Sequence, residues 1–283
     1  MFSLKIENSR GELFELTHNP NYAVVRVDGL TYPSTTVNTS AGASIDGTFY
    51  NSSRVDQRNI VVTVILQGDI ETNRQQLYRI FAIKKPCTIY FKNKNRDVSI
   101  IGYVEVLEGD LFSMREQVQI SIICPRPYFE DMDYIYAEMS TLWNGFEFPF
   151  SVPFGSAIPF SELVAYPLVT INNRGDAETG FIMNISFTGV ITGLKIANTT
   201  TQRFMQFSYL FNSGDEVTID TRSGHMKCEL VRNATTYNIL NWLTDDSTWL
   251  KLDYGDNEFT YTVDAHEENV TIRFTATALY GGV

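Results

Sequence analysis

Short runs of β-branched and aromatic residues, separated by turn-forming residues, recur along most of this 283-residue chain. Val, Ile, Thr, Phe and Tyr favour strands, and the Gly, Asn and Asp residues between the runs favour tight turns. The run at residues 59–67 is the clearest strand, since it is too short for a convincing helix and polar residues bound it. The pattern predicts a mainly β protein.

One helix is expected in the first half of the chain. Thr72 with Gln75 three residues later resembles a capping box. Apolar residues then follow at helical spacing until Pro86 interrupts them: Leu77, Ile80 and Phe81.

The segments around this helix have the pattern of a sheet. Residues 87–91 and 98–106 are predicted strands joined by a polar turn, and residues 117–122 alternate polar and apolar side chains as a further strand. We therefore expect residues 1–130 to form a β-sandwich-like domain with one α-helix.

A connector rich in Pro and Phe is predicted at residues 131–165. Regular structure is not expected between Tyr134 and Pro167, where five Phe residues alternate with prolines: Phe146, Phe148, Phe150, Phe154, Phe160, Pro149, Pro153 and Pro159. A solvated linker would be polar, so this aromatic density predicts packing, either onto the chain's own domains or onto a neighbouring subunit.

Residues 166–283 consist almost wholly of predicted strands and turns. The expected strands are 169–172, 181–187, 217–220, 227–231, 259–263 and 270–276. The expected turns are 213–215, 222–224 and 255–257. Many short strands with no convincing helix predict a second domain that is an antiparallel β-sandwich.

Charge and composition narrow the classes of function. A formal charge of −11 argues against binding to a nucleic-acid backbone, although an acidic channel past which DNA moves remains a hypothesis. The sequence has no pattern of a secretory signal or membrane span, so we expect synthesis in a cytoplasm. Cys87, Cys124 and Cys228 are odd in number and widely spaced, which predicts buried free thiols.

The sequence carries no motif for catalysis, metal binding or cofactor binding, so no catalytic, metal or cofactor residue is predicted. The histidines are isolated: His18, His225 and His266. A glycosidase needs only two carboxylates, so a cell-wall glycosidase stays open as the least favoured alternative. The acidic residues that such a site could use lie in turn-like contexts: Asp245, Asp246, Asp253 and Asp256. Asp215 and Asp256 each follow a Gly and are interpreted as turn residues before calcium ligands, because the spaced acidic loop of a calcium site is absent from the sequence.

Three aromatic residues lie close together in the sequence: Trp242, Trp249 and Tyr237. They are candidate sugar-stacking residues, since aromatic faces on β-sandwiches stack on pyranose rings. Core packing is the commoner role for such rings, so the sequence leaves both interpretations open.

The order of several patterns over both halves resembles the distal tail protein (Dit) family of siphophages that infect Gram-positive bacteria. In the first half these are residues 49–53, 60–66, 77–86 and 124–129, the last reading Cys-Pro-Arg-Pro-Tyr-Phe. In the second half they are residues 175–181, 214–224 and 252–261. Individually these patterns are weak, and their order carries the resemblance.

The resemblance implies a structural role. It implies an N-terminal domain that assembles as a homo-hexameric ring continuing the tail tube, and a C-terminal galectin-like, jelly-roll sandwich outside the ring. The implied partners are the tail tube protein, the tail-associated spike protein and, in some phages, a receptor-binding protein. The implied location is the tail tip, or baseplate, of the virion, after synthesis in the cytoplasm of the bacterial host. A carbohydrate-binding module that attaches the particle to host cell-wall carbohydrate is the alternative.

Overall fold

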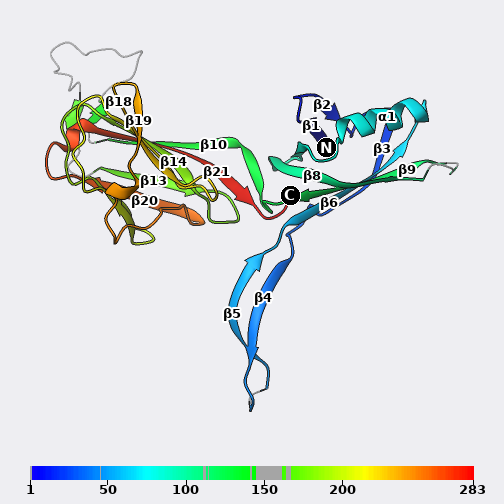
Figure 1. The fold of residues 1–283 in the computed structure, drawn as a ribbon, viewed down its shortest axis with the longest axis horizontal. Coiled ribbons are helices and arrows are strands. Elements are labelled where there is room, and N and C mark those ends of the chain that lie inside the picture. The colour runs from blue at the N-terminus through cyan, green and yellow to red at the C-terminus, as the bar shows by residue number, and fades with distance from the viewer. Residues whose placement is uncertain are drawn as a thin grey trace, which may run out of the picture. The chain divides into compact units, whose positions relative to one another are not determined.

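The structure of this chain is a computed structural model that describes residues 2–44, 46–110, 113, 115–140, 142–144, 161–163 and 167–283 (Figure 1). The described part consists mostly of antiparallel strands, with one α-helix, so the predicted mainly β fold is confirmed. The chain divides into two compact units. Unit 1 contains Met1–Asp133 together with Leu279–Val283, and unit 2 contains Tyr134–Ala278.

Unit 1 is built on one antiparallel sheet. Its strand order is β2 (Leu13–Glu15), β1 (Ser3–Asn8), β7 (Pro86–Lys92), β8 (Asp97–Gly109), β9 (Gln117–Cys124), β6 (Arg58–Leu66) and β3 (Tyr22–Asp28). The predicted strand at 59–67, the predicted hairpin and the predicted strand at 117–122 are confirmed as β6, β7–β8 and β9. Side chains alternate between a buried and an outward face, as Ile60, Val62 and Val64 do on the buried face of β6.

The helix of unit 1, α1 (Ile70–Ile80), packs against β1 and β6. Leu77 and Ile80 are its buried apolar residues, which agrees with the predicted helical spacing. The predicted capping box at Thr72 is wrong, because the helix begins one turn earlier. Asp69 is the N-cap, and its carboxylate accepts hydrogen bonds from Thr72 N at 3.3 Å and Thr72 Oγ1 at 2.7 Å.

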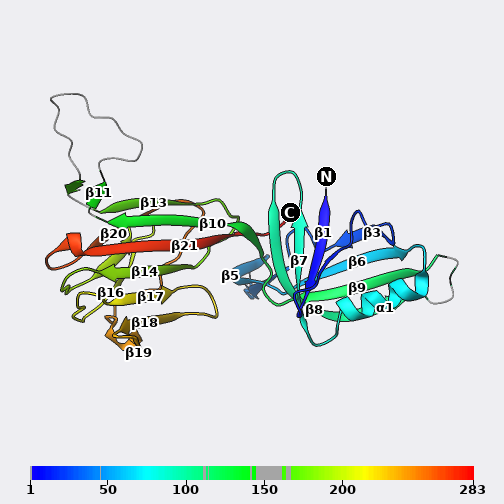
Figure 2. The same ribbon diagram turned by 90° about the horizontal axis from the view of Figure 1, so that it is seen from above.

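Unit 2 is a sandwich of two antiparallel sheets, as predicted. One sheet has the order β19 (Thr235–Asn238), β18 (Lys227–Arg232), β17 (Glu216–Asp220), β14 (Phe181–Phe187), β21 (Val270–Tyr280) and β10 (Phe129–Ser140) (Figure 2). The other has the order β13 (Leu168–Asn173), β20 (Gly255–Thr262), β15 (Lys195–Asn198) and β16 (Arg203–Gln206). β10 and β21 each have residues in both units.

Phenylalanines from both sheets fill the core of unit 2. Phe181, Phe259 and Phe274 pack with ring centroids 5.1–5.7 Å apart, and Phe187 stacks on Phe211 at 4.6 Å. Each fully buried ring contributes about 1.5–3 kcal/mol through removal from water. The alternating apolar residues of the predicted strands therefore point into one shared core.

Two predictions about irregular segments are wrong. Regular structure does continue past Tyr134, because β10 runs to Ser140, and the short strands β11 (Leu142–Asn144) and β12 (Ser161–Leu163) pair with each other. The Pro and Phe residues at 145–160 lie outside the described residues. Residues 255–257 begin β20 instead of forming a turn.

The side chain of Asn257 explains this second error. It is buried, its Oδ1 accepts a hydrogen bond from Asp253 N, and its Nδ2 donates to the carbonyls of Asp253 and Gly255. Asn257 thus holds the turn at residues 253–255 with its side chain, while its backbone is already in the strand.

The cysteines are free and buried, as predicted. Burial raises the pKa of Cys87 to about 11 and those of Cys124 and Cys228 to about 12. Cys87 on β7 and Cys124 on β9 flank β8, and two strand spacings place their Cα atoms roughly 9–10 Å apart, too far for a disulfide. No helix among the described residues is long and apolar enough to cross a membrane.

These thiols should be inert in the folded protein, because the thiolate is the reactive form and their raised pKa values keep them protonated at pH 8. We expect no reaction with iodoacetamide at pH 8 under native conditions and three modified thiols per chain in guanidinium, measured by intact mass. Any stability that these protonated thiols contribute should be fully present below about pH 9 and lost as the pH rises through 11–12. Modification of the native protein would contradict the burial.

Gly102 on β8 should not tolerate a side chain. A Cβ there would lie 2.6 Å from Ile122 Cγ2 and 2.8 Å from Cys124 Sγ. We expect Gly102→Ala to lower the free energy of unfolding by about 1–3 kcal/mol in urea titrations, as overpacked cores do. Gly109→Ala is the matched control on the same strand, since its nearest contact would be 3.5 Å. Equal stability of the two variants would contradict this account.

Candidate assembly site

A two-stranded hairpin of β4 (Thr35–Ala41) and β5 (Thr48–Val55) projects from unit 1 (Figure 1). In the described part of the chain its strands pair only with each other. Val37, Phe49 and Tyr50 are 55%, 55% and 65% exposed. The hairpin therefore presents apolar side chains that stay exposed among the residues that the structure describes.

Polar contacts within the hairpin hold it together. Asn38 Nδ2 donates to Ser52 Oγ at 3.1 Å, the hydroxyls of Tyr50 and Ser53 lie 2.8 Å apart, and the register shifts after Asn38. An isolated two-stranded hairpin is marginally stable in water, because neither face buries enough apolar surface. This geometry favours a partner that covers the ribbon.

Arg58 lies at the base of this hairpin, three residues after β5, and is 2% exposed. Its guanidinium donates to four backbone carbonyls at 2.5–2.7 Å: Gly29, Thr31, Pro127 and Gly281. It also lies 4.4 Å from the centroid of the Phe129 ring. Carbonyl dipoles and the ring face thus stabilise a buried charge.

The backbone conformation of the segment between β3 and β4 lets two of its carbonyls reach Arg58. Gly29 has a φ of +83°, and a Cβ there would lie 2.0 Å from Asn59 O, so only glycine fits. Asp56 N donates to Ser34 O at 2.9 Å and closes the base of the hairpin. The backbone at the base of the hairpin is therefore held in one conformation by these contacts.

The outward face of the unit 1 sheet is partly apolar. Ile101, Tyr103 and Val106 on β8 are exposed there, next to Glu105. Ser121 Oγ donates to Glu105 at 3.1 Å. A row of exposed apolar residues on a sheet is typical of an interaction surface.

A shallow groove of about 530 Å³ crosses β1 and β7. Its charged groups pair with one another: Tyr90 donates to Glu7 at 2.6 Å, and Lys92 lies 2.5 Å from Asp97. The hydrogen bond to Glu7 raises the pKa of Tyr90 to about 12, so this phenol stays protonated near neutral pH. In this groove the phenol and the ammonium group are each paired with a carboxylate.

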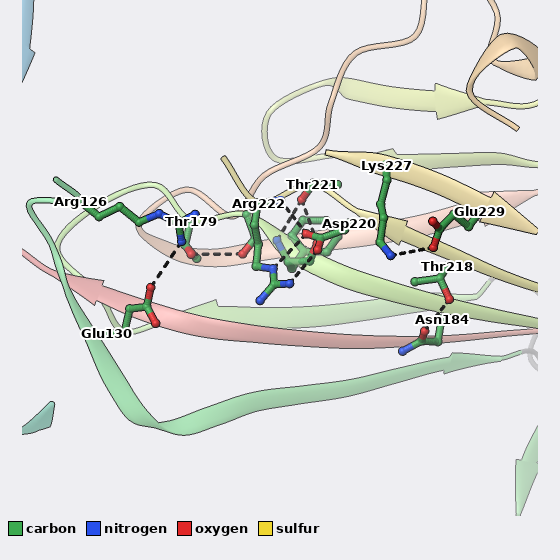
Figure 3. Close-up of polar contacts among 12 residues, drawn as sticks. Arg126, Glu130, Thr179, Asn184, Thr218, Asp220, Thr221, Arg222, Lys227 and Glu229 are labelled. Atoms are coloured by element: carbon green, nitrogen blue, oxygen red, sulfur yellow. Dashed lines mark hydrogen bonds and ion pairs between the residues drawn. The ribbon is translucent and has the colours of Figure 1, made fainter. Parts of the chain in front are cut away.

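The outward face of β14, β17 and β18 in unit 2 is polar (Figure 3). Lys227 lies 2.7 Å from Glu229, and Thr218 Oγ1 donates to Asn184 Oδ1 at 3.1 Å. Just beyond β17, Arg222 holds Asp220 with two hydrogen bonds at 2.7 and 3.0 Å. The polar groups of this face pair with one another across neighbouring positions.

The three candidate sugar-stacking residues have different surroundings. Trp242 stacks on Tyr209, with ring centroids 3.4 Å apart, and both Trp242 and Trp249 pack against the core. Tyr237 lies on the edge strand β19 and is half exposed. Among the described residues these three rings make no ring contact with one another. Sugar binding by this group remains a prediction.

Two of the acidic residues considered above, Asp215 and Asp256, are hydrogen-bonded to other side chains. Asp215, buried in its predicted turn, accepts two hydrogen bonds from Arg232 at 2.5 and 2.8 Å, which hold the pKa of Asp215 below its usual value. Asp256 accepts a hydrogen bond from Asn172 at 2.6 Å. Within the described ranges, no group of three His, Cys, Asp or Glu side chains could hold a metal ion.

Trp242→Ala tests the structural interpretation of this ring. Because its indole is stacked on Tyr209 and packed against the core, we expect the free energy of unfolding to fall by about 2–4 kcal/mol. Tyr237→Ala, on an exposed strand, should change stability by about 0.5 kcal/mol or less. Chemical denaturation measures both values. A stable Trp242→Ala protein that loses binding to host cell walls would instead support the sugar-stacking hypothesis.

Both halves of the chain match phage tail families. Residues 9–124 match the phage tail protein RIFT-related domain. Residues 174–277 match the C-terminal domain of the siphovirus-type tail component. No curated protein sequence has significant similarity to the chain.

Solved structures with the same fold come from phage tails. The crystal structure of SPP1 Dit (gp 19.1), described as a paradigm of the hub adsorption apparatus in phages that infect Gram-positive bacteria, has a TM-score of 0.67 at 17% identity, covering 97% of this chain and 98% of that one. Chains of the phage P2 baseplate in its activated conformation, with Ca and with Sr, have TM-scores of 0.51 and 0.52 at 11% and 10% identity, with full coverage of both chains. Since both halves match tail-component domains in the expected order, the chain belongs to the siphophage distal tail protein (Dit) family.

Proposed function

We propose that this protein is a structural subunit of the phage tail tip, where six copies form a ring. The ring would join the tail tube to the tail-associated spike and the host-adsorption apparatus. Membership of the Dit family supports a tail component, and the similar solved structures belong to a hub and to baseplates. The proposed partners are therefore further copies of this chain, the tail tube protein and the spike protein.

The uncovered hairpin is the observation on which the ring proposal depends. It extends from unit 1, its apolar residues Val37, Phe49 and Tyr50 are solvent-exposed, and its stability calls for a partner. A neighbouring copy supplies such a partner in every subunit of a closed ring, where one surface contacts a different surface of the next copy.

The charge of the unit 1 sheet is compatible with a channel through the ring. The outward positions of the strands β6, β8 and β9 include Glu105 and Glu108 and no Lys or Arg. The outward Lys5 on β1 and Lys92 on β7 pair with Glu15 and Asp97. An acidic or neutral wall would let DNA pass without sticking, because it neutralises no phosphates. This role needs no catalytic step, and we propose none.

Phe49→Asp with Tyr50→Asp should prevent ring formation. Interface anchors of this kind contribute about 2 kcal/mol or more each, so loss of both should weaken subunit association by roughly 1,000-fold. Native mass measurement of the purified protein, alone and mixed with tail tube protein, should give six copies for the wild type and monomers for the variant. The thermal unfolding of the monomer should change little, because both side chains are exposed, although the variant loses the Tyr50–Ser53 contact of the hairpin.

Tyr254→Asp is the matched control, since Tyr254 is a 73% exposed tyrosine in unit 2. It should form rings like the wild type. Rings formed equally well by the hairpin variant, or a wild-type chain that stays monomeric with every tail component, would overturn the proposal.

A further inference from the structure

Residues Leu279–Val283, which we call the return segment, are part of unit 1 although they follow unit 2 in the sequence. They come directly after the main body of β21, which begins in unit 2 at Val270. Unit 1 is therefore assembled from two pieces of chain separated by the whole of unit 2.

Three residues of the return segment contact four residues of the rest of unit 1. Tyr280 Oη donates to Asp131 Oδ2 at 2.9 Å, and the Arg96 guanidinium lies 3.9 Å from the centroid of the Tyr280 ring. Val283 N donates to Leu30 O at 3.0 Å. Gly281 O accepts a hydrogen bond from Arg58 Nη2 at 2.6 Å. Side-chain contacts of Tyr280 and a backbone contact of Val283 thus anchor the segment on both sides of Gly281, which binds Arg58.

Arg58 connects the return segment to the base of the hairpin. The same guanidinium that binds Gly281 O also binds Gly29 O and Thr31 O, which precede β4. If the Gly281 carbonyl were absent, a donor of a buried charged group would lose its acceptor, and such a loss is costly. Arg58 is then expected to move, and the segment between β3 and β4 would lose two of its fixed contacts.

We propose that the return segment is a positioning element for the hairpin, which fixes the direction in which β4 and β5 leave unit 1 through the contacts of Arg58. The part of this proposal that concerns assembly rests on the proposed ring function. Arg58 and Gly281 are separated by 223 residues, so the hairpin is synthesised early and fixed late. Ring-competent chains would therefore be those in which residues 279–283 have been made and have bound in place.

Spin-label distances in the full-length protein test this coupling. Ser44→Cys lies near the hairpin tip and Tyr78→Cys on α1, both at exposed positions, and the three natural thiols are buried. Pulsed electron–electron double resonance on labelled chain diluted with unlabelled chain should give one narrow distribution of the distance between the two labels. Arg58→Lys keeps the charge but lacks the planar fork that reaches four carbonyls. Tyr280→Ala releases the return segment, and Tyr280→Phe keeps the ring but removes the hydroxyl that binds Asp131.

We expect Arg58→Lys and Tyr280→Ala each to broaden the distribution at least twofold and to reduce the yield of rings at least tenfold. The double variant should be little worse than either single variant, because both changes act through the same segment. Arg273→Ala is the matched control, since Arg273 is an exposed arginine on β21 that pairs with Glu138 inside unit 2. It should leave both the distribution and the ring yield unchanged.

An unchanged distribution in folded Arg58→Lys and Tyr280→Ala proteins would overturn the positioning role. If both variants unfold unit 1 completely, Tyr280→Phe decides: a broadened hairpin distance in a folded protein supports the role, and a wild-type distance overturns it. The distance readout does not depend on ring formation. Broadening in a protein whose wild type never forms rings would support the coupling while contradicting the proposed function.

Discussion

The buried guanidinium of Arg58 is the constraint on which unit 1 depends. A charge that is 2% exposed must find acceptors for its N–H groups, and here four carbonyls from three separate stretches of chain supply them. These stretches are the segment before the hairpin, the segment before β10, which contributes Pro127, and the return segment. One side chain therefore ties the two pieces of unit 1 together, and it does so at the point where the hairpin begins.

The two units differ in how much of their apolar surface is buried, and how many of their polar groups are paired, within the unit itself. Unit 2 buries its phenylalanines between two sheets and pairs the polar groups of its outward face with one another. Unit 1 also buries a core, but it extends a hairpin whose apolar residues are exposed in the described part of the chain, and its sheet has a partly apolar outward face. Incomplete burial in unit 1 is what a subunit that assembles with copies of itself would require.

Much of the fold can be predicted from local sequence patterns, and the predictions that are wrong have physical causes. The strands that became β6, β7, β8, β9 and β14 have strong β-branched alternation, and the sequence predicts them well. The turn predicted at Gly255-Asp256-Asn257 lies two residues earlier, because the side chain of Asn257 hydrogen-bonds to the backbone of Asp253 while its own backbone is in a strand. The short strands β15, β16 and β19 have no distinct pattern and exist because neighbouring strands pair with them.

The sequence by itself determined the mainly β composition, the single helix, the buried free thiols and the resemblance to tail proteins, because these depend on local residue preferences and on motif order. The tertiary structure alone decided the candidate site. The Thr-, Ser- and Asn-rich hairpin has no core-facing pattern to reveal it, and nothing local marks Arg58 as different from a surface arginine at a strand end. Its partner Gly281 is 223 residues away, and contacts between residues so distant are fixed only when the whole chain has packed.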